Sequence, residues 1–151
     1  MANESLLEFI QGDVFDAKSF GVDGLAVFYH GLSAIRAEAG KHEADAKFNA
    51  AFRAVRYIDT DGQGPDGTTR VENVEVMRKL INDILGEFAA GNCRKIAMNG
   101  IRVYNLPDAH VRPEKYQIQF IKEWLALHPG VFEKICLIDQ RDGFNRADDK
   151  I

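Results

Sequence analysis

The chain has 151 residues, a length typical of one domain that buries a single hydrophobic core. Hydrophobic residues make up 46% of the chain and charged residues 28%, a balance that argues against disorder and indicates a globular protein. The net charge is −4 and Lys and Arg are not clustered, so we expect no binding to nucleic acid. We also expect a cytoplasmic protein without membrane contact, because no apolar stretch could cross a bilayer and the N-terminus lacks a signal-peptide pattern.

Apolar runs and helical segments alternate in the first half of the chain. Residues 6–10 predict a strand, and residues 24–29 a second one, whose continuous apolar character is typical of a strand covered on both faces. Residues 33–55 are rich in Ala, Glu and Lys, which predicts two helices separated near Gly40. Residues 54–58 are equally compatible with a short strand, because so brief a run has no decisive periodicity.

A turn-rich loop and a long helix follow. Residues 59–68 contain several glycines in turn-forming contexts and predict a surface loop. The helix is predicted to begin near residues 69–72, which form a capping-box pattern, and to end at Gly91 in a left-handed cap.

The last third of the chain repeats the alternation. Residues 95–98 predict a strand, residues 113–127 a helix, and residues 135–138 a final buried strand. Strands that alternate with helices in this way predict a three-layer α/β/α sandwich, with helices on both faces of a central sheet. We expect the tail after about residue 145 to be frayed.

Residues that commonly bind metals form no recognisable site in the sequence. Cys93 at a helix-to-strand junction and Cys136 inside a strand have no metal-ligand spacing, so we interpret both as reduced thiols. Asp139, Arg141 and Asp142 follow the last predicted strand and are interpreted as a solvated turn. We therefore expect neither a metal nor a cofactor.

Three segments of the first half carry a family resemblance. They are Gly12-Asp13-Val14, the apolar run 24–29, and residues 34–40, which read Ala-Ile-Arg-Ala-Glu-Ala-Gly. Together they resemble the first third of a macro domain, the family that binds ADP-ribose, whose members read roughly "GDI", "VDAIVNAAN" and "AIHRAAG". The resemblance implies a single macro-like domain over residues 1–151 with a mixed central sheet.

Both glycine-rich loops of the family are altered in this sequence. The family's two strand-ending asparagines correspond to Val27 and His30, and its glycine run is reduced to Gly31-Leu32-Ser33. Residues 96–107 resemble the second phosphate loop, roughly "IAFPAIGTGVYGFP", but lack its Gly-Thr-Gly. Arg102 stands near that gap, where its guanidinium could bind phosphate in place of the glycine amides.

The resemblance implies roles for two residues that follow predicted strands. Asp13 corresponds to the aspartate that accepts a hydrogen bond from the adenine amino group, although a Gly-Asp pair is equally suited to capping a turn or a short helix. His30 is the first catalytic candidate, because it ends a strand and an imidazole can act as acid or base, with Asp23 or Glu38 to orient it. A structural role for this histidine is the alternative.

Two further residues are ligand-binding candidates. Tyr104 occupies the position of the aromatic residue that packs on the distal ribose in the family, with core packing as the alternative. Asn99 could hydrogen-bond a sugar or only a turn.

These observations predict a divergent macro-like domain that binds ADP-ribose or a related nucleotide, weakly or with altered specificity, and that is at most a weak ADP-ribosyl hydrolase. The alternative is a non-catalytic protein-interaction domain that has lost the nucleotide site. Loss of both glycine loops favours the alternative, whereas Asp13 and Tyr104 favour the nucleotide. Residues 40–69 are shorter and more helical than in the family pattern, which leaves open the loss of a sheet strand.

Overall fold

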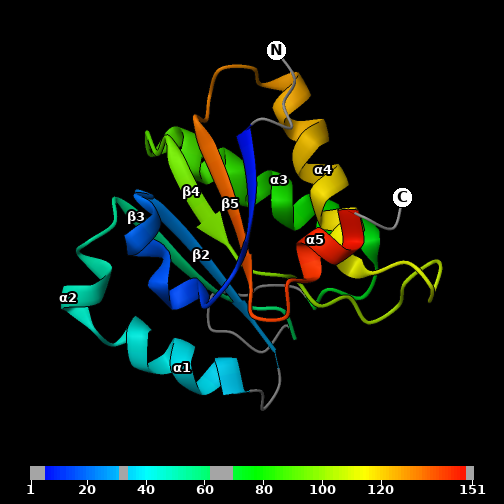
Figure 1. The fold of residues 1–151 in the computed structure, drawn as a ribbon, viewed down its shortest axis with the longest axis horizontal. Coiled ribbons are helices and arrows are strands. Elements are labelled where there is room, and N and C mark those ends of the chain that lie inside the picture. The colour runs from blue at the N-terminus through cyan, green and yellow to red at the C-terminus, as the bar shows by residue number, and fades with distance from the viewer. Residues whose placement is uncertain (1–5, 31–33, 62–69, 149–151) are drawn as a thin grey trace.

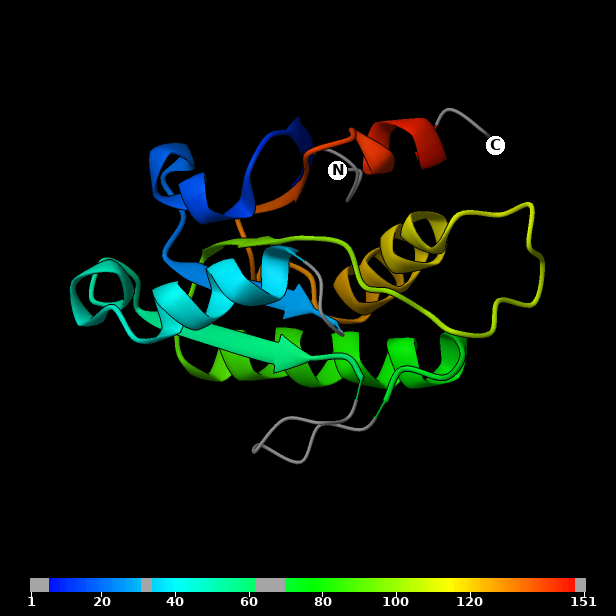
Figure 2. The same ribbon diagram turned by 90° about the horizontal axis from the view of Figure 1, so that it is seen from below.

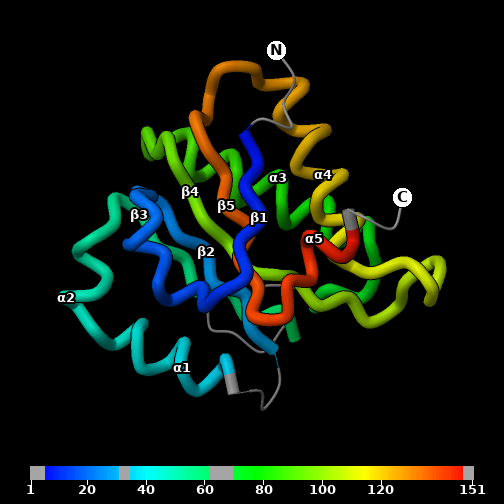
Figure 3. Tube along the Cα trace, viewed as in Figure 1, coloured from blue at the N-terminus to red at the C-terminus, as the bar shows by residue number. Residues whose placement is uncertain are grey.

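The computed structural model describes residues 6–30, 34–61 and 70–148. Five strands form one sheet in the order β1-β5-β4-β2-β3 (Figure 1). The first and last strands of the chain therefore pair with each other, as the trace in Figure 3 shows. The strands are β1 (Leu7–Gln11), β2 (Gly24–Tyr29), β3 (Ala54–Asp59), β4 (Lys95–Met98) and β5 (Lys134–Asp139).

Helices cover both faces of this sheet (Figure 2). Helices α3 and α4 pack on one face, and η2, α1 and α2 on the other, so the predicted α/β/α sandwich is confirmed. None of the described helices is long and apolar enough to cross a membrane. The helices are η2 (Val14–Phe20), α1 (Ala34–Glu43), α2 (Ala46–Asn49), α3 (Val74–Ala90), α4 (Pro113–Leu127) and α5 (Gly143–Asp148).

Strand β2 shows why the sheet is covered on both faces. Alternate side chains of a strand point to opposite faces, so a strand buried on both faces is apolar throughout. Ala26 and Phe28 enter the core beneath α3 and α4, whereas Leu25 and Val27 enter the core beneath η2 and α1. All four side chains are at most 2% exposed. Burial of a large apolar side chain stabilises the fold by about 1.5–3 kcal/mol.

Every pairing among the described strands is parallel, whereas the resemblance implied a mixed sheet. The connections explain the parallel pairing, because each of the first four strands is followed by a helical segment that returns the chain to the same end of the sheet. The sheet strand whose loss the sequence left open is present, because β3 pairs with β2 along its whole length. The parallel arrangement places the carboxyl ends of all five strands at one edge.

Helix α3 begins and ends differently from the prediction. Asn73 caps its first turn, because Asn73 Oδ1 accepts hydrogen bonds from the amides of Glu75 and Val76 at 3.0 and 3.1 Å. The predicted capping box is wrong at this helix start, and Thr69 lies outside the described residues. At the other end Gly91 has a φ of −85°, and the left-handed conformation falls on Asn92 with a φ of 64°. Asparagine tolerates that conformation better than most residues with a β-carbon.

Helix α5 continues to Asp148, past residue 145, after which a frayed tail was expected. Phe144 and Ala147 are each 1% exposed, and the Phe144 ring stacks on Phe9 of β1 with a centroid distance of 6.4 Å. Apolar contacts therefore hold this segment on the sheet as far as Asp148. Residues 149–151 lie outside the described residues.

Candidate functional site

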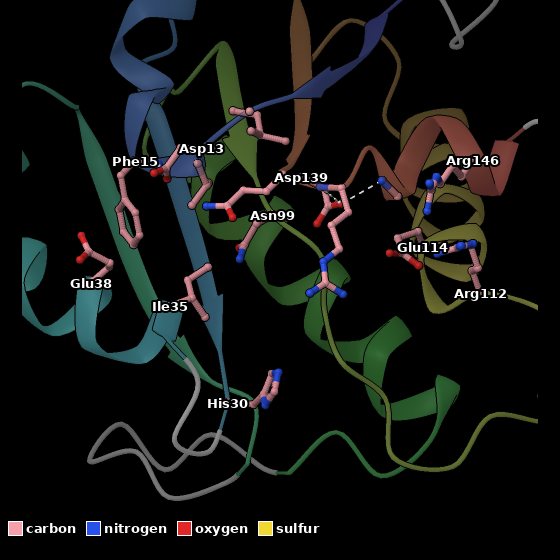
Figure 4. Close-up of a pocket in the computed structure, with 16 residues that line it drawn as sticks. Asp13, Phe15, His30, Ile35, Glu38, Asn99, Arg112, Glu114, Asp139 and Arg146 are labelled. Carbon is pink, nitrogen blue, oxygen red and sulfur yellow. Dashed lines mark hydrogen bonds between the residues drawn. The ribbon is translucent and has the colours of Figure 1, made fainter.

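A cleft of about 580 Å³ opens at the carboxyl edge of the parallel sheet (Figure 4). Residues 12–15 reach it from the end of β1, His30 from the end of β2, Asn99 from β4, and residues 138–141 from β5. Side chains of α1, α4 and α5 complete its walls. Ligand sites of open α/β folds commonly lie at this edge, and the volume is in the range of small-molecule pockets.

Asp13 both caps a helix and lines the cleft. Its Oδ1 accepts a hydrogen bond of 2.9 Å from the amide of Phe15 and so caps η2. No hydrogen bond from the described residues occupies Oδ2, which leaves acceptor capacity on the cleft side. The two interpretations of Asp13 are therefore compatible, because the cap holds the carboxylate in a fixed orientation.

His30 lies in the lower part of the cleft in Figure 4, apart from the residues expected to orient it. Asp23 is at the opposite end of β2, where its carboxylate accepts hydrogen bonds from the amides of Arg94 and Lys95. Glu38 lines the cleft, but near Phe15. The ring contact is instead with Arg102, whose Nη1 lies 3.3 Å from His30 Nδ1. A guanidinium only donates, so this contact places the neutral ring's proton on Nε2.

Asn99 positions the cleft edge. Its Oδ1 accepts a hydrogen bond of 2.7 Å from the amide of Phe28, and its Nδ2 donates one of 2.8 Å to the Phe28 carbonyl. The buried Gln117 continues the network: its Oε1 accepts from the Ile101 amide at 2.9 Å, and its Nε2 donates to the Asn99 carbonyl at 3.0 Å. Asn99 thus extends the β2–β4 pairing beyond the end of β4, and Gln117 fixes where the next loop leaves the sheet.

Tyr104 and Arg102 lie beside the cleft and are not among its lining residues. The Tyr104 ring contacts two guanidiniums, with its centroid 3.8 Å from Arg70 Cζ and 4.9 Å from Arg102 Cζ. Its hydroxyl donates a hydrogen bond to Asp61, and this bond raises the Tyr104 pKa. The side chain is half-exposed, so core packing does not describe it. The structure thus brings Asp13, His30 and Asn99 into one cleft and holds Arg102 and Tyr104 in an adjacent cluster.

The loop after β5 is an exposed turn, as the sequence predicted, and it also forms part of the cleft wall. Asp139 Oδ2 accepts hydrogen bonds from the amides of Arg141 at 3.0 Å and Gly143 at 2.8 Å, so the carboxylate caps α5. Only the position of these residues in the sequence could have indicated that they line the cleft, because residues that follow a buried parallel strand share the edge where ligands bind.

Glu114, in the first turn of α4, is another lining residue that the sequence analysis missed. Its Oε1 is buried and has no hydrogen-bond partner in the described part of the chain. The backbone of α5 passes close by, since a β-carbon on Gly143 would lie 2.4 Å from Glu114 Oε2. Figure 4 shows Glu114 grouped with Arg112 and Arg146 at one end of the cleft.

Among residues 6–30, 34–61 and 70–148, no three His, Cys, Asp or Glu side chains are placed to hold a metal ion. Both cysteines are buried and free, and burial raises the Cys136 pKa to about 11. Neither thiol lines the cleft.

Comparison with known proteins gives a structural likeness only. No protein-family profile and no curated protein sequence matches the chain. Among solved structures, a Trypanosoma brucei macrodomain in complex with ADP has a TM-score of 0.71 at 15% sequence identity, covering 99% of this chain and 70% of that one. The complex with ADP-ribose gives a TM-score of 0.68 at 14% identity, covering 96% and 68%. Another crystal form gives 0.69 at 14%, covering 96% and 66%.

The chain therefore has the macrodomain fold, as the resemblance implied. Its sequence has diverged far from the macrodomain structures it matches, and it spans about two thirds of their length. A shared fold does not by itself establish a shared ligand.

Proposed function

We propose that the cleft binds ADP-ribose or a related adenine nucleotide. The observation that carries the proposal is Asp13, whose Oδ2 carries no described hydrogen bond in a cleft at the strand ends of a macrodomain fold. A carboxylate in that place can accept a hydrogen bond from an adenine amino group. The structural relatives crystallised with ADP and ADP-ribose support the choice of ligand class.

The affinity is expected to be low. The Gly-Thr-Gly of the family's second phosphate loop is missing between Asn99 and Leu106, and the reduced run Gly31-Leu32-Ser33 lies outside the described residues. Each neutral hydrogen bond contributes on the order of 1 kcal/mol, so the loss of three amide donors would weaken binding roughly a hundredfold. Arg102 could compensate in part, although its described contacts are with His30 and Tyr104.

Substitution of Asp13 by Asn provides a sharp test. Asparagine keeps an oxygen that can cap η2, but it replaces the other acceptor with an NH₂ donor that repels an adenine amino group. In calorimetric titrations with ADP-ribose, Asp13→Asn should lower the affinity about tenfold or more. The matched control is Asp45→Asn, because Asp45 caps α2 in the same way and does not line the cleft.

The outcomes of that titration separate the two functions. Equal affinity of the wild type and Asp13→Asn would contradict the assignment of Asp13, and nanomolar binding by the wild type would contradict the argument from the altered loops. If no adenine nucleotide binds the wild type, the alternative of a protein-interaction domain is favoured. The internal contacts of Asn99 and Tyr104 are compatible with that alternative. A cytoplasmic location remains a prediction in either case.

A further inference from the structure

Half of the ten arginines in the described part of the chain have a carboxylate partner. Five of them form ion pairs, and these anchor helices and loops to their neighbours. The pairs are Arg36 with Asp59, Arg56 with Glu87, Arg70 with Glu72, Arg78 with Glu75 and Glu123, and Arg94 with Glu133.

Arg112, Arg141 and Arg146 differ from these arginines in two respects. None of them forms an ion pair within residues 6–30, 34–61 and 70–148, and all three line the cleft. They come from separate elements: Arg112 directly precedes α4, Arg141 follows β5, and Arg146 belongs to α5. The fold therefore brings together three guanidiniums that no sequence spacing connects. Figure 4 shows Arg112 and Arg146 together at one end of the cleft.

Two carboxylates that line the cleft do not neutralise this group. Asp139 uses its Oδ2 to cap α5 through two backbone amides. Glu114 lies close beneath the backbone of Gly143, and its buried Oε1 has no described partner. Neither carboxylate forms an ion pair with Arg112, Arg141 or Arg146 among the described residues. The donors of the three guanidiniums thus remain available to a ligand.

We infer that this arginine end of the cleft is a phosphate subsite, and that the protein prefers phosphorylated adenine nucleotides to the uncharged nucleoside. The inference rests on the proposed function, in which the cleft binds an adenine nucleotide. It places the phosphate at the start of α4, at α5 and at the loop after β5. None of the three arginines belongs to residues 96–107, which resemble the family's second phosphate loop, or to the reduced glycine run at residues 31–33. Guanidinium groups bind phosphate oxygens through paired, charge-assisted hydrogen bonds, and several guanidiniums that line one cleft can bind the several oxygens of one phosphate group.

The test is a set of calorimetric titrations of the full chain with adenosine, adenosine 5′-monophosphate, adenosine 3′-monophosphate, ADP-ribose and pyrophosphate. The variants are Arg112→Gln, Arg141→Gln, Arg146→Gln and Arg146→Lys. Arg53→Gln is the matched control, because Arg53 is exposed, forms no described ion pair and precedes β3 at the other edge of the sheet. Thermal unfolding of each variant confirms that it is folded.

At least one monophosphate should bind about tenfold or more tightly than adenosine, and Arg→Gln at the subsite should remove most of that gain. Arg146→Lys should restore only part of it, because lysine lacks the planar fork. The better of the two monophosphates identifies which phosphate position the subsite takes. Higher salt should weaken the phosphorylated ligands and leave adenosine unchanged.

The subsite and the proposed function fail in different ways. If adenosine binds as tightly as both monophosphates, or if the three Arg→Gln variants bind ADP-ribose like the wild type, the phosphate subsite is wrong while nucleotide binding stands. If pyrophosphate binds in an arginine-dependent manner but no adenine compound does, the subsite stands and the nucleotide proposal is wrong. Absence of binding by every probe overturns both.

Discussion

At the scale of single residues, the cleft depends on side chains that hydrogen-bond the protein's own backbone. Asp13 and Asp139 hold backbone segments that line the cleft, and Asn99, itself a lining residue, holds the backbone of Phe28. Because these polar groups have partners, they keep fixed orientations without leaving buried donors or acceptors unsatisfied. The hydrogen-bonding capacity of Asn99 is the most fully used of the three. Both its amide oxygen and its amide nitrogen bind Phe28, and the residue is 7% exposed.

Replacement of Asn99 by Ala should therefore mainly lower the stability of the fold, with a smaller effect on ligand binding. The change removes two hydrogen bonds and leaves the amide and carbonyl of Phe28 without partners, at a cost of roughly 2–4 kcal/mol. Urea unfolding measures the loss. Asn105→Ala is the control, because Asn105 is exposed and, among the described residues, its side chain hydrogen-bonds Glu72 alone, so the change should cost less than about 1 kcal/mol. Equal effects of the two substitutions would contradict the role given to Asn99.

His30 is the residue on which any catalysis is predicted to depend. Hydrolysis of an ADP-ribosyl bond needs a group that organises water, and His30 is the imidazole that lines the cleft. We predict little or no release of ADP-ribose from a modified protein by the wild type, and loss of whatever activity exists in His30→Ala. His110→Ala, at an exposed histidine outside the cleft, should behave like the wild type. Robust turnover that His30→Ala leaves intact would refute the assignment.

At the scale of elements, the start of β2 packs closely against the end of α3. A β-carbon on Gly24 would lie 2.9 Å from Ile96 Cγ2, 3.2 Å from Cys93 Sγ and 3.3 Å from the ring of Phe88. These atoms belong to buried side chains and have little room to move. Glycine at position 24 is thus required by packing.

Alanine substitutions at two glycines should consequently have opposite effects. Gly24→Ala should destabilise the protein by about 1–3 kcal/mol through overpacking. Gly86→Ala, inside α3 where a β-carbon meets nothing within 4 Å, should stabilise it by up to about 1 kcal/mol through helix propensity. Denaturant unfolding of both variants checks the sign. A neutral Gly24→Ala would show that β2 and α3 are less closely packed than described.

Helix α2 is tied to β3 by Tyr57, whose hydroxyl donates a 2.6 Å hydrogen bond to Asn49 Oδ1. Burial, with smaller contributions from Glu43 and Asp45, raises the Tyr57 pKa from 10.0 to about 12. The folded state therefore keeps a proton that the unfolded state loses from about pH 10 upward. This contribution to stability is fully present below pH 10 and disappears as pH rises towards 12.

The urea midpoint of the wild type should accordingly fall between pH 9.5 and about 11.5. The fall should be smaller in Tyr57→Phe, although not abolished, because the pKa values of Tyr104 and Cys136 are also raised in the folded protein. Identical pH profiles for the two proteins would contradict the burial argument for Tyr57.

At the scale of the whole molecule, the sequence predicted the layers better than the cleft. Apolar runs such as residues 24–29 predict buried strands because burial on both faces demands continuous apolar character, and the fold follows from their alternation with helices. Asp13 and His30 could be found because each directly follows such a strand. Arg112, Glu114 and Arg146 could not be found, because they reach the cleft only when α4 and α5 pack beside β5. The expected mixed sheet came from the family resemblance, whereas the connections of this chain make it parallel.

The most direct test of the central claim is an amide chemical-shift titration of the ¹⁵N-labelled protein with ADP-ribose. Binding in the cleft predicts the largest shifts at the amides of Asp13, Phe15 and Gly143, because these lie where the ligand would meet the loops after β1 and β5. The amides of Gly21 and Arg53, which do not line the cleft, should not move. Shifts confined to residues outside the cleft, or no shifts at millimolar ligand, would contradict the account.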